Sequence, residues 1–177
     1  AEFALPNMPE NRWQVWDDLQ QLGVDMVVQP STGRRKKMLL ADMDSTMIEQ
    51  ECIDELADQA GVGDHVKAIT ARAMNGELDF NAALTERVAL LRGLPVGVID
   101  EVLHKRITYM PGGAVLLATM KASGAHAALV SGGFTAFTAQ VAAYLGFHEH
   151  RANVLLTDGA TLSGQVALPI LGREAKV

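Results

Sequence analysis

Two aspartates stand directly behind a short apolar run in the first third of the chain. The run is Met38-Leu39-Leu40-Ala41, and Asp42-Met43-Asp44-Ser45-Thr46 follows it. A continuous apolar run is typical of a strand buried on both faces, and ligands of open α/β sheets bind at the carboxyl ends of such strands. Two carboxylates placed there need a cation or a proton to offset their repulsion. The pattern favours an Asp nucleophile and a second Asp for proton transfer, both beside Mg²⁺.

A calcium-binding loop also begins with Asp-x-Asp, but it does not fit this sequence. Counted from Asp42, its glycine position holds Met47 and its bidentate glutamate position holds Ile53. A solvated turn is the other alternative, although such turns rarely follow a fully apolar strand with two acids. We therefore predict a catalytic role for Asp42 and Asp44.

A second motif, Ser131-Gly132-Gly133-Phe134-Thr135, follows another apolar run, Ala127-Ala128-Leu129-Val130. Glycine lets the backbone approach an anion, a helix N-terminus offers free N–H groups, and Ser131 adds a hydroxyl donor. Glycine-rich turns between a strand and a helix are common, so the motif is weak alone. It gains weight because it would lie at the same sheet edge as Asp42.

The elements that must position these residues alternate between strand and helix. Residues 115–120 have an apolar helical pattern that Gly124 ends, and residues 134–145 have another that Gly146 ends. Strand, crossover helix, strand and helix predict an α/β fold with a parallel sheet.

Two further stretches complete the expected architecture. Residues 47–107 have a helical pattern throughout, with stops at Gly61, Asn75-Gly76 and Gly93, which predicts a helical insertion after the first strand. Residues 154–166 predict a hairpin with an Asp-Gly turn.

The first 36 residues carry no catalytic signal. Two tryptophans and two leucines recur at helical spacing over residues 13–22 and predict a helix that packs on something. Residues 30–33, Pro-Ser-Thr-Gly, predict a linker.

Composition bounds the class of protein. The 177 residues are 49% hydrophobic and 20% charged, which suits a packed core and argues against disorder. The net charge of −6 argues against general nucleic-acid binding, and no apolar run reaches the roughly 18 residues of a membrane span. Cys52 is the only cysteine, so we expect no intramolecular disulfide and a reduced, cytoplasmic setting.

The Asp42 motif, the helical insertion, the Ser131 motif and a later Lys176 resemble the first three motifs of the haloacid dehalogenase superfamily. Within it, the sequence is similar to the phosphoserine phosphatase family over about residues 37–177. The more specific matches are Glu51-Cys52-Ile53-Asp54-Glu55, the segment 73–80 and Arg87-Val88.

This resemblance implies a Rossmann-like parallel-sheet core with an α-helical cap inserted after the first strand. Residues 37–47 and 108–177 would form the core, residues 48–107 the cap, and residues 1–36 an N-terminal extension or linker. A cap of this kind excludes water and contacts the substrate when it closes.

The resemblance also implies a mechanism. Asp42 would attack phosphorus to form an aspartyl-phosphate, and Asp44 would protonate the departing serine oxygen and then activate water. Ser131, the Gly132 N–H and Lys176 would hold the phosphoryl oxygens. Mg²⁺ would be held by the Asp42 carboxylate, the Asp44 backbone carbonyl and a later loop.

The implied substrate is O-phosphoserine, in the last step of serine biosynthesis. Glu51 would face its ammonium group and Arg87 its carboxylate, while Met74 and Phe80 would wall the pocket. From the residues alone, the simpler interpretation is that Met74 and Phe80 pack inside the cap. For Arg87 the simpler interpretation is an exposed position on a helix. No nucleic-acid or membrane partner is expected, and a homo-oligomer stays open.

The family's fourth motif, a Gly-Asp-Gly-x-Asn-Asp loop that helps to hold the metal, would follow Lys176, but the sequence ends at Val177. We therefore expect this chain, as given, to bind the metal weakly. Two alternatives stay open. One is a phosphatase for another small phosphomonoester, against which Glu51 and Arg87 argue. The other is an inactive phospho-binding fragment, against which Asp44 argues.

Overall fold

The computed structural model describes residues 2–172, and the chain divides into two units, residues 1–36 and 37–177. The first unit contains one helix, α1 (Arg12–Gln21), as the sequence predicts. None of the residues of α1 is buried, and Trp13 is 65% exposed. The helix is thus confirmed, and the packing of its tryptophans stays a prediction.

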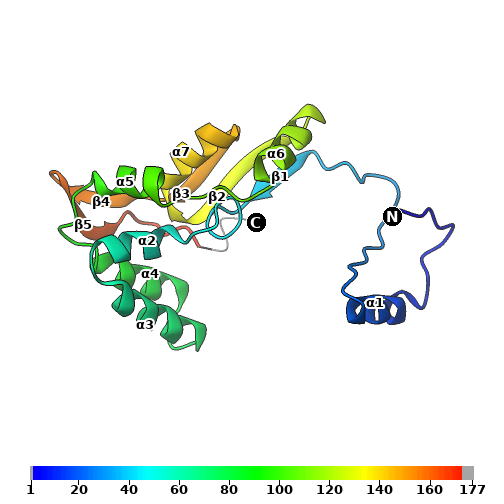
Figure 1. Ribbon diagram of the computed structural model, residues 1–177, viewed down its shortest axis with the longest axis horizontal. Coiled ribbons are helices and arrows are strands. Elements are labelled where there is room, and N and C mark those ends of the chain that lie inside the picture. The colour runs from blue at the N-terminus through cyan, green and yellow to red at the C-terminus, as the bar shows by residue number, and fades with distance from the viewer. Residues whose placement is uncertain (1, 173–177) are drawn as a thin grey trace. The chain divides into compact units, whose positions relative to one another are not determined.

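The second unit alternates strands and helices along the chain (Figure 1). Its elements are β1 (Met38–Ala41), α2 (Cys52–Gln59), α3 (Gly63–Met74), α4 (Phe80–Ala89), α5 (Val98–Lys105), α6 (Gly113–Ala122), β2 (His126–Phe134), α7 (Thr135–Leu145), β3 (Glu149–Asn153), β4 (Leu155–Asp158) and β5 (Thr161–Val166).

A three-stranded parallel sheet with the order β1-β2-β3 forms the centre of this unit. Successive parallel strands lie side by side, so each connection must cross over, and right-handed crossovers place their helices on one face. Accordingly, α6 packs on β1 and β2, α7 packs on β2 and β3, and the two helices touch each other. The predicted α/β class with a parallel sheet is confirmed.

The second strand is longer than predicted. Its residues 127–130 are buried as expected, but the extended backbone continues through the Ser131 motif to Phe134. Helix α7 begins at Thr135, the last residue of the motif, so the motif does lead into a helix, but its two glycines lie in the extended backbone of β2 and not in the first turn of α7. The pairing of β2 with β3 shifts register between Val130 and Phe134, which lets the strand pass through the glycines as an irregularity instead of a turn.

Helices α2, α3 and α4, which we call the helical cluster, gather on the side of the strands opposite α6 and α7 (Figure 1). Helices α2 and α3 end just before the predicted stops Gly61 and Gly76, which have positive φ, whereas α4 ends at Ala89, four residues before the predicted stop Gly93. The helical pattern predicted for residues 47–107 is interrupted, however, by an irregular segment before Cys52 and by another between α4 and α5.

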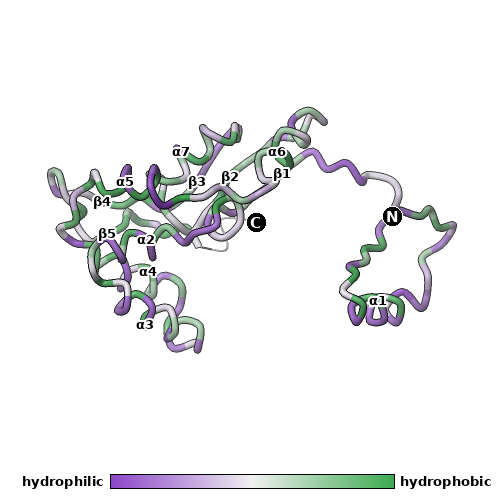
Figure 2. The backbone as a smooth tube through the Cα atoms, viewed as in Figure 1, coloured by the Kyte–Doolittle hydropathy of each residue, from purple (hydrophilic) through white to green (hydrophobic). Residues whose placement is uncertain are grey.

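The core joins the helical cluster to the sheet. Leu56 of α2, Val88 of α4, Phe134 of β2 and Phe137 of α7 belong to one buried cluster, each at most 2% exposed. In Figure 2 the hydrophobic colour is prominent along β2 and α6. The predicted hairpin is present as antiparallel β4 and β5. Within residues 2–172, no helix is long and apolar enough to cross a membrane.

Candidate active site

The loop after β1 is folded back tightly on itself. The carbonyl of Met43 accepts backbone N–H groups from Thr46, Met47 and Ile48 at 3.2, 2.9 and 3.1 Å. This turn requires a positive φ of 52° at Ser45, which is rare outside glycine. The chain thereby reverses at the carboxyl end of β1 and keeps both aspartates of the motif at the sheet edge.

The carboxylate of Asp44 joins three separate elements. Its Oδ1 accepts the backbone N–H of Cys52, the first residue of α2, at 2.9 Å. A helix N-terminus carries partial positive charge, so it favours an anion at this position. Its Oδ2 accepts the Ser131 hydroxyl from β2 at 3.1 Å. Both oxygens are held, which fixes the orientation of this carboxylate.

A cavity of about 190 Å³ opens between the sheet edge and the helical cluster. It is lined by Asp42, Asp44, Glu51, Ile53, Phe80, Leu84, Arg87, Ser131, Gly132, Gly133 and Phe134. The aspartates and the Ser131 motif come from the carboxyl ends of β1 and β2, while α4 supplies Phe80, Leu84 and Arg87.

Phe80 of the helical cluster lies close to Gly132 at the sheet edge. A Cβ atom on Gly132 would lie 3.0 Å from the Phe80 ring, so the glycine leaves room for this aromatic side chain. Phe80 is 43% exposed and begins α4, directly after the capping Asp79. Phe80 thus forms part of the wall between the cavity and solvent.

Charged groups of opposite sign line the same cavity. Burial raises the pKa of Glu51, and the nearby Asp44 and Asp54 raise it further, while a 2.7 Å hydrogen bond from the Ser45 hydroxyl opposes the shift. Burial also lowers the pKa of Arg87, an effect that the negative charges of Asp54 and Glu51 oppose. The cavity thus holds one cationic and one anionic side chain in addition to the two aspartates.

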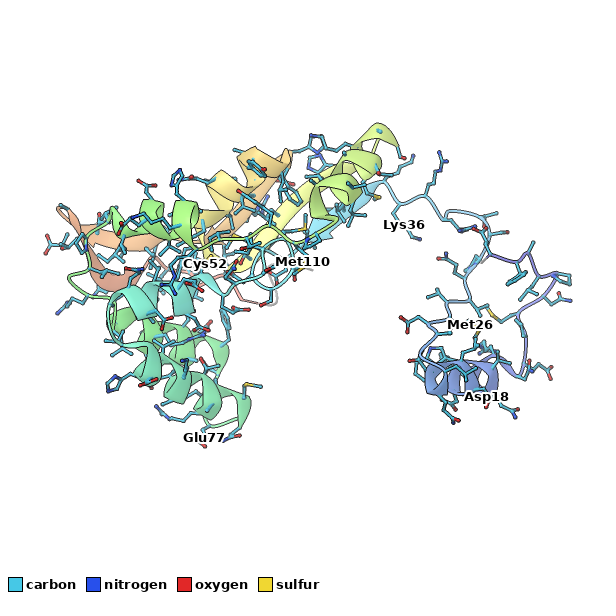
Figure 3. All side chains as sticks on the ribbon, in the orientation of Figure 1. Asp18, Met26, Lys36, Cys52, Glu77 and Met110 are labelled. Carbon is cyan, nitrogen blue, oxygen red and sulfur yellow. The ribbon has the colours of Figure 1, made fainter. Side chains whose placement is uncertain are left out.

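Cys52 is buried in the middle of the second unit (Figure 3). Burial, together with the nearby negative charge of Asp44, raises the pKa of its thiol. A thiol that resists ionisation is a poor nucleophile. Cys52 therefore contributes packing and its backbone N–H, as expected for a small core residue.

Of the nine predicted site residues, seven line this cavity: Asp42, Asp44, Glu51, Phe80, Arg87, Ser131 and Gly132. Met74 does not. It ends α3, is 84% exposed, and precedes Glu77, which marks the tip of the helical cluster in Figure 3. Lys176 lies outside the described residues.

Four lining residues were not predicted as site residues: Ile53, Leu84, Gly133 and Phe134. Gly133 and Phe134 stand inside the Ser131 motif, and Ile53 stands inside the Glu51 motif, so their neighbours in sequence were a usable signal. Leu84 lies one helical turn from both Phe80 and Arg87, and this spacing could have revealed it.

The donors at the sheet edge suit a hard cation. Asp42 can supply a carboxylate oxygen and Asp44 its backbone carbonyl oxygen, and Mg²⁺ prefers such oxygen ligands, commonly taking only one or two protein carboxylates besides water and substrate phosphate. Within residues 2–172, no group of three or more His, Cys, Asp or Glu side chains could hold a metal ion. The described lining of the cavity offers oxygen ligands and no Cys or His side chain, which suits Mg²⁺ better than zinc.

Known proteins are similar to this chain in sequence and in fold. The model of the haloacid dehalogenase-like hydrolase family matches residues 39–177. A phosphoserine phosphatase from Archaeoglobus fulgidus is 41% identical over 178 residues, covering 99% of this chain. A solved phospho-aspartyl intermediate analogue of phosphoserine phosphatase matches 74% of this chain and 62% of its own, with 40% identity and a TM-score of 0.69. A family hydrolase from Salmonella enterica serovar Typhi covers 92% of this chain and 56% of its own, with 32% identity and a TM-score of 0.83.

The chain therefore belongs to the haloacid dehalogenase-like hydrolase family. It is similar to phosphoserine phosphatases, as the sequence motifs suggested. It spans 52% of the length of the Archaeoglobus fulgidus relative, and 48% of a probable phosphoserine phosphatase from Schizosaccharomyces pombe.

Proposed function

We propose that this protein hydrolyses O-phosphoserine to serine and phosphate through an aspartyl-phosphate intermediate. One observation carries the proposal: a single cavity has Asp42 and Asp44 at the sheet edge and Glu51 and Arg87 on its other walls. The aspartates suit a phosphomonoester, while the charged pair suits the ammonium and carboxylate of an amino acid.

The chemistry divides between the two aspartates. An oxygen of Asp42 bonds to phosphorus while the bond from phosphorus to the serine oxygen breaks, and protonated Asp44 gives its proton to that oxygen. Water then attacks the phosphorus of the aspartyl-phosphate, gives a proton to Asp44, and releases phosphate with the Asp42 carboxylate restored. Asp44 is well placed for both transfers because Cys52 and Ser131 fix its carboxylate.

Mg²⁺ is the proposed cofactor, held by the Asp42 carboxylate and the Asp44 backbone carbonyl. When bound, it reduces the repulsion between an anionic nucleophile and an anionic phosphate. Ser131, the Gly132 N–H and Lys176 are the proposed ligands of the phosphoryl oxygens.

Substrate selection is assigned to the helical insertion. We propose that residues 48–107 act as a cap over a core formed by residues 37–47 and 108–177, with residues 1–36 as an extension. Glu51 would bind the ammonium and Arg87 the carboxylate of phosphoserine, with Phe80 closing the side. Met74 would join this wall only after a movement of the cap, because it is exposed at its outer end.

The proposed role is the last step of serine biosynthesis, in the cytoplasm. It fits the free, buried Cys52 of the described chain, which needs no oxidising compartment. Similarity to proteins named phosphoserine phosphatase supports the substrate, as does the presence of both charged groups in the cavity.

The test is phosphate release from O-phosphoserine by the purified protein with Mg²⁺, beside p-nitrophenyl phosphate and a sugar phosphate. We expect a clear preference for phosphoserine in kcat/KM, and loss of all turnover in Asp42→Asn because the amide is a poor nucleophile. Near-normal turnover in Asp42→Asn would exclude the aspartyl-phosphate route. A preference for the sugar phosphate would favour the other phosphomonoesterase alternative.

A further inference from the structure

Asn153, the last residue of β3, is a buried polar side chain outside the cavity lining. It is 2% exposed, and its amide is fully engaged. Its Nδ2 donates to the carbonyl of Gly132 at 2.8 Å and to that of Leu171 at 3.2 Å, and its Oδ1 accepts the Leu171 N–H at 2.7 Å. A buried amide with all of these bonds holds its partners in place, because losing any one of them would leave a buried polar group unpaired.

The Gly132 carbonyl lies where the pairing between β2 and β3 is interrupted. Val130 is opposite Arg151 and Phe134 is opposite Asn153, so three residues of β2 face the single Ala152 of β3. Residues 131–133 therefore bulge out of the ladder, as bulges near active sites do to redirect a strand. The Asn153 side chain supplies to this bulge a hydrogen bond that the regular ladder does not.

From this bulge a chain of hydrogen bonds runs to Asp44. The Gly132 carbonyl and the Gly133 N–H belong to one planar peptide group, so fixing the carbonyl also fixes the direction of the N–H. The Gly133 N–H donates to Ser131 Oγ at 2.9 Å, and the Ser131 hydroxyl donates to Asp44 Oδ2 at 3.1 Å. Every donor in the chain points toward Asp44, an arrangement in which successive bonds strengthen each other.

We propose that Asn153 is a positioning residue for the phosphoryl-transfer reaction. It acts through the Gly132–Gly133 peptide group and the Ser131 hydroxyl, and so orients both the phosphate-binding segment and the Asp44 carboxylate. The same amide holds the backbone of Leu171, five residues before Lys176 in the sequence. The proposal rests on the proposed phosphatase activity for its kinetic readout, but the binding of inorganic phosphate tests it separately.

The decisive variant is Asn153→Asp, which keeps the shape of the side chain but, when ionised, cannot donate to the Gly132 carbonyl. We expect kcat for O-phosphoserine to fall by about 10- to 100-fold, the usual range for a residue that orients an active-site ligand. Asn7→Asp makes the same chemical change at an exposed position of the first unit and should leave kcat unchanged.

A double-mutant cycle distinguishes positioning from general stabilisation. Ser131→Ala interrupts the same chain of bonds one step further on, so the double variant Asn153→Asp/Ser131→Ala should lose little more than Ser131→Ala alone. Each kcat is measured at a temperature at which circular dichroism shows the variant folded. Fully multiplicative losses would overturn the proposal, since they would mean that Asn153 does not act through Ser131.

Calorimetric titration with inorganic phosphate and Mg²⁺ completes the experiment. Asn153→Asp should weaken phosphate binding by a similar factor, whereas Asn7→Asp should not. If the wild-type protein binds phosphate and Asn153→Asp weakens it, but phosphoserine is not turned over, then the proposed function fails and the positioning role stands. If phosphoserine is turned over equally by wild type and Asn153→Asp, the positioning role fails and the proposed function stands.

Discussion

Gly133 leaves the space that the Asp44 carboxylate occupies. A Cβ atom on Gly133 would lie 2.6 Å from Asp44 Oδ2, closer than such atoms approach, and a tight 3.1 Å from Ser131 Oγ. The carboxylate cannot withdraw freely, because Cys52 and Ser131 hold its two oxygens. The position of Asp44, the proposed acid–base residue in the loop after β1, therefore depends on the absence of a side chain at Gly133 of β2.

This contact predicts that Gly133→Ala impairs catalysis through Asp44. We expect kcat for O-phosphoserine to fall about 100-fold, the loss typical of a 1 Å misplacement of a reacting group. Gly97→Ala is the matched control, since a Cβ there would have no heavy atom within 4 Å. Steady-state kinetics with thermal unfolding of both variants would check the effect. An unchanged kcat in folded Gly133→Ala would show that Asp44 tolerates displacement.

Arg87 provides a test of substrate selection. Arg87→Lys keeps the positive charge but loses the planar fork that matches a carboxylate. We expect kcat/KM to fall about tenfold or more for O-phosphoserine, the loss of roughly one charge-assisted hydrogen bond, and to change little for p-nitrophenyl phosphate, which has no carboxylate. Arg72→Lys is the control, because Arg72 pairs with Glu86 on the surface of the helical cluster. Equal losses on both substrates would mean that Arg87 does not bind the carboxylate.

The raised pKa of Glu51 predicts that rising pH has opposite effects on the stability of the protein and on substrate binding. Burial, together with Asp44, Asp54 and Asp42, raises its pKa above the ordinary 4.5, despite the opposing bond from Ser45. Between 4.5 and the raised value the folded state binds more protons than the unfolded state, so the contribution of Glu51 to the free energy of unfolding falls as pH rises. Binding of the substrate ammonium needs ionised Glu51, so it should strengthen across the same window.

The comparison of wild type with Glu51→Gln checks this prediction. Urea unfolding without Mg²⁺ should show that the stability difference between the two depends on pH in this window, because the glutamine side chain of the variant does not titrate. KM for O-phosphoserine should fall more steeply with rising pH in wild type than in the variant, which keeps only the pH dependence that does not come from Glu51, including that of the substrate phosphate. Glu77→Gln, at the exposed tip of the helical cluster, should behave as wild type. A stability difference that is constant with pH would refute the raised pKa.

Local signals in the sequence were sufficient for most of the elements. Both apolar runs form parallel strands, and the stops at Gly61 and Gly76 were predicted correctly, because each depends on residues close in sequence. Strand β3 was not predicted. Its sequence Glu-His-Arg-Ala-Asn has neither an apolar run nor a clear alternation, and it is a strand because β2 lies beside it to pair with.

The candidate site was predictable where residues belong to motifs, and less so where distant segments meet. Asp42 and Ser131 were expected at one sheet edge and lie there. Met74 was expected at the pocket wall but is exposed, because its position depends on how the helical cluster lies over the sheet. Asn153 was missed since its role arises from contacts with Gly132 and Leu171, 21 and 18 residues away.

The two proposed roles of Asp44, as acid and as base, can be separated by comparing substrates with different leaving groups. In Asp44→Asn no acid protonates the serine oxygen, so we expect turnover of O-phosphoserine to fall about 10²- to 10⁴-fold. The p-nitrophenolate ion leaves without a proton, so formation of the aspartyl-phosphate on Asp42 should be affected much less with p-nitrophenyl phosphate. Hydrolysis of the aspartyl-phosphate still needs Asp44 as a base, so this intermediate should accumulate in Asp44→Asn.

A stopped-flow measurement of p-nitrophenol release from Asp44→Asn would show this accumulation as a burst of about one equivalent per active site, followed by slow turnover. Asp42→Asn is the control and should give no burst, because it lacks the nucleophile. The amide oxygen introduced by Asp44→Asn can still accept the Cys52 N–H, so the variant is expected to fold, which circular dichroism would verify. Equal slowing of both phases would mean that Asp44 mainly supports Asp42, and rapid turnover of both substrates would exclude it as the acid and base.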